Sequence, residues 1–371
     1  MDEGVVWIGL DLGLRRTQVC AIDHSGESVH EQDCETSLAA LQDALAIFPL
    51  RRIGLIAVEA GSGVHIVRKL RGAGFPVALF EARKASRFLG VRRNKTDASD
   101  ARGLADLARL GRNTVSQVHL KSLQCQELRS QLAMRHKVVR LRVAMEGMLR
   151  SRLALYGRPL GPVHSAAGLK AQMAEALAQI EAEEGVDLSK DVGPLVQLCE
   201  SLRSYLRGVD RNLAKEASQH PVCSRLMDVS GVGPICALSF YSAVEEPSRF
   251  ERTSDVAAYL GLTPRRYQSG KVSFTRGITK TGNKLTRTHL VNAAIALSSR
   301  GSDSELKQWA TTLQERIGSP RARVAVARKL AILLLTIWKT GVPFEPFPSK
   351  QFIGRQTAEE VYTFSCIPLI D

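Results

Sequence analysis

Hydrophobic and polar positions in the first hundred residues predict strands at first and then strands alternating with helices. Four apolar segments have the length and pattern of strands, at residues 5–13, 16–23, 52–60 and 76–82. The third is almost continuously apolar, as in strands that are buried on both faces of a sheet. Helical spacing at residues 37–48, and again after Gly63, fills the intervals. This order predicts an α/β domain with a mixed sheet.

The pattern changes to helical spacing through the middle of the chain. Leucines and valines recur at three and four positions across residues 120–155, which predicts one long helix or a helical hairpin. Residues 156–164 break it, and further helix over 168–218 is interrupted near 183–187 and 191–194. Strict heptads are not evident, so pairing of these helices with each other or with a second subunit stays open.

The charge of the chain bears on the kind of partner that it binds. The chain has 51 Lys and Arg against 37 Asp and Glu, a formal net charge of +14, so an acidic partner is expected. Residues 256–302 contain eight basic residues and no Asp or Glu, and further basic stretches run over 83–95 and 121–158. Any one run is explained equally well as a solvated face. Three runs favour a polyanion, whose phosphates would neutralise them.

The cysteines and the apolar runs bear on the compartment. The seven cysteines are scattered and form no Cys-x-x-Cys pair, which indicates buried thiols rather than a disulfide framework or a zinc site. The first residues lack the basic region of a signal peptide. The most apolar run, residues 330–338, is shorter than the roughly 20 residues of a membrane span. These features predict a soluble, cytoplasmic protein with no membrane partner.

Four carboxylates stand where catalytic groups gather in α/β sheets. Asp11 lies in the apolar first strand, where a carboxylate needs a partner, and Glu59 ends the third apolar segment. Asp97 and Asp100 share one face of an expected first helical turn. Together they could hold two divalent ions, Mg²⁺ or Mn²⁺, about 3.5–4 Å apart, as phosphoryl transfer requires. The alternatives are that Asp97 and Asp100 only cap a helix and complement its dipole, and that Glu59 is a polar strand end.

The "IGLDLG" strand is also similar to the strand that opens sugar kinases and actin-like ATPases. Those enzymes need a second Asp-and-Gly phosphate loop and a Gly-rich adenosine loop further along, and neither is evident here. The nucleotide-binding interpretation is therefore disfavoured.

Seven short segments of the sequence together carry a resemblance to a known family. In chain order they are "IGLDLG", "VEAGSG", "NKTDASDARGLA", "VHLKS", "VSGVGPICA", "YLGLTPRRYQSG" and "GITKTGN". In order and approximate spacing they resemble the DEDD transposases of bacterial insertion sequences, the bridge-RNA-guided family with a RuvC-like N-terminal domain and a serine-containing C-terminal domain. The resemblance covers residues 5–345. It departs from the family after Glu59, where Thr-Gly and an aromatic are common, and at Gln268, where an acidic residue is common.

The resemblance implies a fold and its division. It implies an α/β RNase H-like (RuvC-like) catalytic domain over residues 1–115 and a long helical, coiled-coil-like middle over 116–220. A mostly α C-terminal transposase domain with a helix-hairpin-helix-like element follows over 221–345, and a tail over 346–371.

The resemblance also implies roles and partners. The metal-binding catalytic tetrad is Asp11, Glu59, Asp97 and Asp100, and Ser269 is the nucleophile that cleaves the strand. Donor and target DNA and an element-encoded guide (bridge) RNA are the expected partners, in a bacterial cytoplasm. A homo-oligomer, dimer or tetramer, is expected as well.

Taken from the residues alone, Ser269 before Gly270 is most simply part of a turn. A serine hydroxyl is a weak nucleophile without an activating base or metal, and no neighbouring His supplies one. Metal ions held by the N-terminal domain would supply that activation.

Other residues in the C-terminal part are expected to contact nucleic acid. They are Arg265, Arg266, Tyr267, Lys280, Gly231 and Gly233. The two arginines would hold the scissile phosphate, and the tyrosine would stack on a base or sugar. The glycines would free backbone N–H groups at a helix start for a phosphate, although a purely structural turn explains them equally well.

Three functions stay open at this point. The first is an RNA-guided transposase that uses both the carboxylates and the serine. The second is a RuvC-like nuclease that hydrolyses branched DNA with Ser269 as a turn residue, and the third is a catalytically silent nucleic-acid-binding protein. The intact tetrad argues against the third, and the "PRRYQSG" segment, which a simple resolvase does not need, argues against the second.

Overall fold

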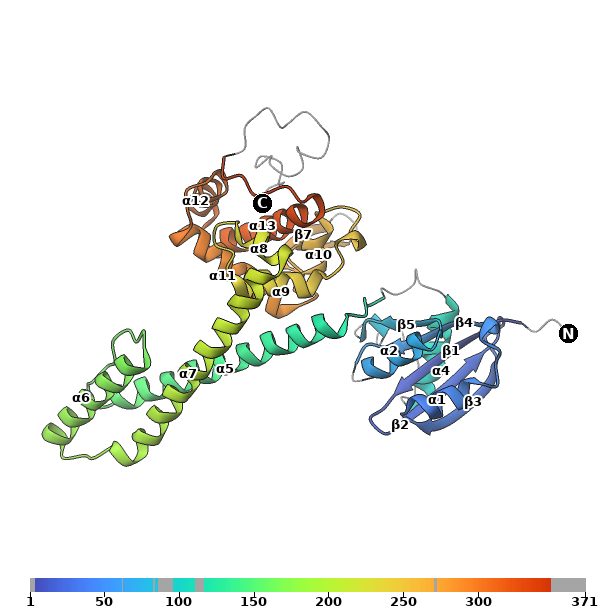
Figure 1. Cartoon of the computed structure of the whole chain (residues 1–371), viewed down its shortest axis with the longest axis horizontal. Coiled ribbons are helices and arrows are strands. Elements are labelled where there is room, and N and C mark those ends of the chain that lie inside the picture. The colour runs from blue at the N-terminus through green and yellow to red at the C-terminus, as the bar shows by residue number, and fades with distance from the viewer. Residues whose placement is uncertain are drawn as a thin grey trace. The chain divides into compact units, whose positions relative to one another are not determined.

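The computed structural model describes residues 4–61, 63–82, 84–85, 96–110, 117–269 and 272–347, without the side chains of 266–269 and 272–276. The chain forms two compact units, residues 1–122 and 123–371 (Figure 1). The finer division predicted within the second unit stays a prediction.

The first unit is built on a mixed sheet with the strand order β3-β2-β1-β4-β5 (Figure 1). The strands are β1 (Val6–Leu12), β2 (Arg16–Ile22), β3 (Ser28–Glu35), β4 (Ile53–Glu59) and β5 (Val77–Phe80). β1, β2 and β3 are antiparallel neighbours, whereas β4 pairs in parallel with both β1 and β5. This arrangement confirms the predicted mixed sheet and is compatible with an RNase H-like fold.

Helices cover both faces of this sheet. Alternate residues of each strand point to opposite sides, so each strand contributes side chains to both interfaces. Ile8 and Leu10 of β1 pack in one cluster with α1 (Leu38–Leu45) and α2 (Val64–Gly72), and the short helix η1 (Leu50–Arg52) precedes β4. On the opposite face, α4 (Asp97–Leu110) packs against β1, β2 and β4. The sheet is therefore the middle layer of three.

The second unit is mostly helical. Its helices are α5 (Leu123–Ala154), α6 (Ala166–Glu184), α7 (Ser189–Gln219), α8 (Pro221–Met227), α9 (Pro234–Val244), η2 (Pro247–Arg249), α10 (Asp255–Tyr259), α11 (Lys284–Arg300), α12 (Glu305–Ile317) and α13 (Ser319–Thr340). A hairpin of β6 (Pro264–Ser269) and β7 (Val272–Ile278) interrupts them. One apolar core joins α5 and α7 to α8, α9, α11 and α13, and a second gathers the far ends of α5 and α7 around α6.

The helical middle differs in one place from the prediction. The segment over 120–155 is a single helix, and the break near 183–187 is confirmed at Gly185, which ends α6 with a φ of 65°. The interruption expected near 191–194 is wrong, because α7 continues through Pro194. Val192 and Val196 are buried on either side while Pro194 is exposed, so packing holds this turn in helical form.

The long helices α5 and α7 pack antiparallel with a seam of positions spaced three and four apart. On α5 these positions are Leu128, Leu132, Arg135, Val139, Arg142, Glu146, Leu149 and Leu153. On α7 they are Val192, Val196, Cys199, Arg203, Leu206, Asp210, Leu213 and Ala217. Ion pairs join the two helices where the seam is charged, Arg135 with Asp210 and Arg203 with Glu146. The heptad pattern is therefore present, but charged residues in the seam hide it from a reading of hydrophobic positions.

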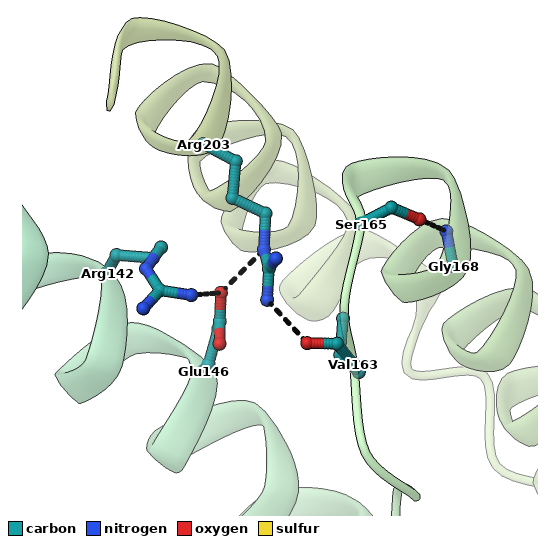
Figure 2. Close-up of polar contacts among 6 residues, drawn as sticks. All are labelled: Arg142, Glu146, Val163, Ser165, Gly168 and Arg203. Carbon is teal, nitrogen blue, oxygen red and sulfur yellow. Dashed lines mark hydrogen bonds and ion pairs between the residues drawn. The ribbon is translucent and has the colours of Figure 1, made fainter. Parts of the chain in front are cut away.

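The charged layer around Glu146 is buried. Its carboxylate accepts hydrogen bonds from Arg203 Nε at 2.8 Å and from Arg142 Nη1 at 3.4 Å (Figure 2). Arg203 also donates to the Val163 carbonyl at 3.3 Å, which ties the loop before α6 to the same layer. Glu146 is 5% exposed and Arg203 9%, so this ion pair is shielded from solvent.

The predicted thiol state is confirmed for the cysteines within the described residues. All six of them are buried, and none forms a disulfide. Cys366 lies outside the described residues.

Candidate active site

The end of the central strands brings two of the predicted carboxylates together. Leu10 of β1 pairs with Val58 of β4, so Asp11 and Glu59 follow side by side on neighbouring parallel strands, which lie about 4.8 Å apart. Strand alternation places both on the same face as Gly9 and Ala57, the face that α4 covers. Both side chains are half-buried.

The direction of α4 bears on the placement of the other two predicted carboxylates. Arg102 and Arg109, in later turns of α4, donate to backbone carbonyls in the turn between β2 and β3. That turn lies at the end of the sheet where β1 begins. The second turn of α4 instead lies against Gly9, further along β1, so the helix runs from the end where β1 and β4 finish towards the end where β1 begins. Its first turn carries Asp97 and Asp100.

Thr96 and Ser99 form the side-chain cap of α4, while Asp97 and Asp100 stand in the same first turn, where acidic side chains complement the helix dipole. The Ser99 N–H donates to Thr96 Oγ1 at 3.1 Å, and the Thr96 N–H donates to Ser99 Oγ at 3.0 Å. This reciprocal pair is the arrangement of a capping box, so the helix start is capped without either carboxylate. The spacing of Thr96 and Ser99 is a signal that the sequence analysis missed.

The donor chemistry at this edge suits a hard divalent cation, because all four candidate ligands are carboxylates. Within the described part of the chain, no group of three or more His, Cys, Asp or Glu side chains is arranged to hold a metal ion. The donor type and the backbone positions thus fit a metal. The described carboxylate side chains do not converge on one point in groups of three or more.

The serine of the second unit lies at the end of a strand. Ser269 is the last residue of β6 and pairs with Val272 of β7, and Gly270 and Lys271 between them lie outside the described residues. The side chains of Arg266, Tyr267 and Ser269 also lie outside the part of the chain that the structure describes, so their contacts with nucleic acid stay predictions.

The base of this hairpin is held by backbone and arginine contacts. The Thr279 N–H donates to the Thr263 carbonyl at 2.9 Å. Arg287 Nη1 donates to the Leu260 carbonyl at 2.9 Å and to the Thr281 carbonyl at 2.8 Å. Partial burial lowers the pKa of Arg287 from its usual value. Nothing in the sequence distinguishes Arg287 from the exposed basic residues around it.

Two expected phosphate contacts remain open to a ligand at the surface. Arg265 and Lys280 are both exposed. Lys280 has a φ of 56°, a left-handed conformation that is uncommon outside glycine, and its N–H donates to the Gly261 carbonyl at 3.1 Å. Its backbone is thereby fixed while its side chain stays accessible.

The two glycines between α8 and α9 have different surroundings. Gly231 has a φ of 87°, and a Cβ there would lie 2.6 Å from the Ala293 carbonyl oxygen of α11. Close packing therefore accounts for Gly231 without a phosphate. Gly233 is exposed, immediately precedes α9 and has open space where a Cβ would be. Of the pair, only Gly233 presents a free helix start to a ligand.

In the part of the chain that the structure describes, we find no helix that is both long and apolar enough to cross a membrane.

Comparison with known proteins gives one consistent result. A family model of IS110-type DEDD transposases, described as "Transposase", matches residues 8–157, and the model "Transposase IS116/IS110/IS902 family" matches residues 223–310. The chain is 29% identical to the transposase for insertion sequence element IS1111A of Coxiella burnetii, over 88% of each chain. It is 27% identical to a probable family 20 transposase of Pseudomonas aeruginosa, over 91% of this chain and 98% of the relative. The transposase for insertion sequence element IS1328 of Yersinia enterocolitica is 24% identical over 92% and 98%.

Proposed function

This chain belongs to the IS116/IS110/IS902 family of transposases, enzymes that cleave and rejoin DNA, and on that premise we propose how the cleavage is divided between its two units. The carboxylates Asp11, Glu59, Asp97 and Asp100 bind divalent metal, Mg²⁺ or Mn²⁺. Ser269 of the second unit attacks the scissile phosphodiester.

The observation that carries the metal proposal is the shared edge of β1, β4 and α4. Two carboxylates follow neighbouring strands on the face that α4 covers, and two more stand in the first turn of that helix. Membership of a DEDD family implies dependence on a divalent metal. Such ions, when bound, act as Lewis acids on the attacking and leaving oxygens of the phosphodiester. The work of the chain's own residues is to hold four oxygen ligands in place around them.

The proposal for Ser269 is supported by its place in the hairpin. It ends β6, five residues beyond Pro264 at the clamped base, in a stretch of 256–302 that lacks acidic residues. That local positive charge favours an anionic ligand such as the phosphate of a nucleic acid. In the reaction, the serine oxygen forms a bond to phosphorus, the bond to the 3′ or 5′ oxygen breaks, and the hydroxyl proton passes to solvent or to the leaving oxygen.

The experiment that tests Ser269 is the capture of its phosphodiester adduct. Full-length protein is incubated with end-labelled DNA from the flanks of its gene, with RNA transcribed from the same flank and with Mg²⁺, and then denatured. We expect labelled protein from the native chain and from Ser273→Ala, a matched serine on the paired strand, and none from Ser269→Ala. Normal cleavage and rejoining by Ser269→Ala would instead favour a nuclease that uses water.

The nucleic-acid partners are donor and target DNA together with an element-encoded guide RNA. Support comes from the acid-free basic stretch at 256–302, in which Arg265 and Lys280 are exposed, and from the exposed α9 start at Gly233. Binding of RNA transcribed from the gene's flank, compared with a scrambled RNA of equal length, tests the guide. Equal affinity for the two would leave only general polyanion binding.

A homo-oligomer, dimer or tetramer, is supported by the outer side of α5. Met134, Leu141 and Met148 stand seven residues apart, outside the seam with α7, and are 53%, 56% and 47% exposed. Apolar side chains at this spacing form a stripe that another helix can cover. Sedimentation of the native chain and of Leu141→Glu tests it. The expected result is an assembly that the glutamate weakens, and a monomeric native chain would contradict it.

A further inference from the structure

Gly9 lies directly against the backbone of α4. A Cβ on Gly9 would stand 1.9 Å from the Ala101 carbonyl oxygen and 2.4 Å from the Ala105 nitrogen. The φ of Gly9 is not in the positive range, so its backbone does not require glycine. What requires glycine is the space, because any side chain would force the helix away from the sheet.

This contact sits just inside the edge that carries the carboxylates. Gly9 precedes Asp11 by two residues on the same face of β1, a distance of about 6.8 Å along a strand. On the helix side, Ala101 directly follows Asp100 and comes one turn, about 6 Å, after Asp97. The close contact between Gly9 and α4 is thus adjacent in the chain to both halves of the predicted tetrad.

The rest of the interface leaves α4 little freedom to adjust. Ala101 and Ala105 are fully buried and pack with Cys20 and Ile22 of β2. The small side chains of Ala101 and Ala105 therefore let α4 pack against β2 as well as against Gly9. A displacement at Gly9 is therefore passed to the first turn of α4 rather than absorbed by a loose side chain.

We propose that Gly9 is a positioning residue, which sets the distance between the carboxylates of the sheet edge, Asp11 and Glu59, and those of α4, Asp97 and Asp100. This inference rests on the proposed metal-binding function of these four residues. It adds that the spacing of the two pairs is fixed by a glycine that itself touches neither metal nor DNA.

The experiment measures Mn²⁺ binding to the metal-free, full-length protein without nucleic acid, by following free Mn²⁺ with EPR. Gly9→Ala should weaken Mn²⁺ binding at least about tenfold, the lower end of the effect of residues that orient metal ligands. The matched control is Ile8→Ala, which removes a buried side chain from the neighbouring residue on the face covered by α1 and α2. It should lower the thermal unfolding midpoint yet keep Mn²⁺ affinity within about twofold, because it leaves the α4 contact intact.

The outcomes separate this inference from the proposed function. A folded Gly9→Ala protein that binds Mn²⁺ as tightly as the native chain overturns the role of Gly9 alone. A native chain that binds no Mn²⁺ overturns the proposed metal cluster and this inference with it. Where Gly9→Ala fails to fold, Ala105→Ser is measured, which adds one oxygen to the same interface. A weaker Mn²⁺ affinity in that folded variant supports the spacing role, and an unchanged affinity contradicts it.

Discussion

Arg203 of α7 donates to the carboxylate of Glu146 on α5 at 2.8 Å (Figure 2), in the seam between the two helices. Two guanidiniums, those of Arg203 and Arg142, share this carboxylate. A buried charge is tolerated only when paired, so a shift of one helix along the other would leave Glu146 and Arg203 buried without their partners.

Removing this carboxylate should destabilise the second unit strongly. We expect Glu146→Gln to lower the free energy of unfolding by about 3 kcal/mol, because Arg203 is left buried without a counter-charge. The control is Glu183→Gln, which breaks the more exposed pair of Glu183 with Arg158 and should cost less than about 1 kcal/mol. Urea unfolding followed by circular dichroism measures both. Equal losses of unfolding free energy in the two variants would show that burial does not make the Glu146 pair more important for stability than the exposed pair.

His289 of α11 should make stability depend on pH. Burial lowers its pKa from 6.5 to about 4, with Arg135 and His136 adding to the effect, and its Nδ1 has no hydrogen-bond partner among the residues that the structure describes. Since the folded pKa lies below the unfolded one, the unfolded chain binds the proton more readily between pH 4 and 6.5. Stability should therefore fall as pH is lowered through that window, by on the order of 3 kcal/mol in total, and stay level above it.

Unfolding measured at pH 7 and at pH 4.5 tests this dependence. His289→Gln should lose much of the difference between the two, and the exposed His164→Gln should keep it. Unchanged pH dependence in His289→Gln would exclude His289 as its source.

The salt dependence of DNA binding should distinguish two basic residues that look alike in the sequence. Lys280 is exposed, so Lys280→Gln should reduce the slope of log K against log salt by about one if it contacts a phosphate. Arg287 donates to two backbone carbonyls at the base of the hairpin, so Arg287→Gln should leave the slope unchanged. Fluorescence anisotropy with a labelled duplex between 50 and 200 mM salt measures both, which is the range over which phosphate contacts alter affinity strongly. A reduced slope for Arg287→Gln would assign it to DNA instead.

Local sequence pattern predicts the first unit better than the second. Alternating and continuous apolar runs identify the central strands, because each strand has to bury its own side chains. The heptads of α5 and α7 are missed because Arg135, Glu146 and Arg203 occupy core positions, and their pairing depends on partners far away in the chain.

In the candidate site, too, only the features that follow from local sequence pattern could be predicted. Asp11 and Glu59 are predictable as strand-end carboxylates, since strand position and face follow from local pattern. The role of Gly9 is not, because it depends on which helix packs against β1. Thr96 and Arg287 were likewise missed, the first through an overlooked capping pattern and the second because its carbonyl partners come from the fold.

The central claim is that four carboxylates on β1, β4 and α4 support DNA cleavage. It is tested most directly by the rate of Mg²⁺-dependent cleavage of end-labelled flanking DNA, with RNA from the same flank, by Asp11→Asn, Glu59→Gln, Asp97→Asn and Asp100→Asn. Loss of one metal ligand should exceed the 10–100-fold loss typical of outer partners, so we expect each rate to fall at least about 100-fold with DNA affinity nearly unchanged. Asp106→Asn, further along α4, should cleave at the native rate. Native cleavage by any of the four variants would contradict the account.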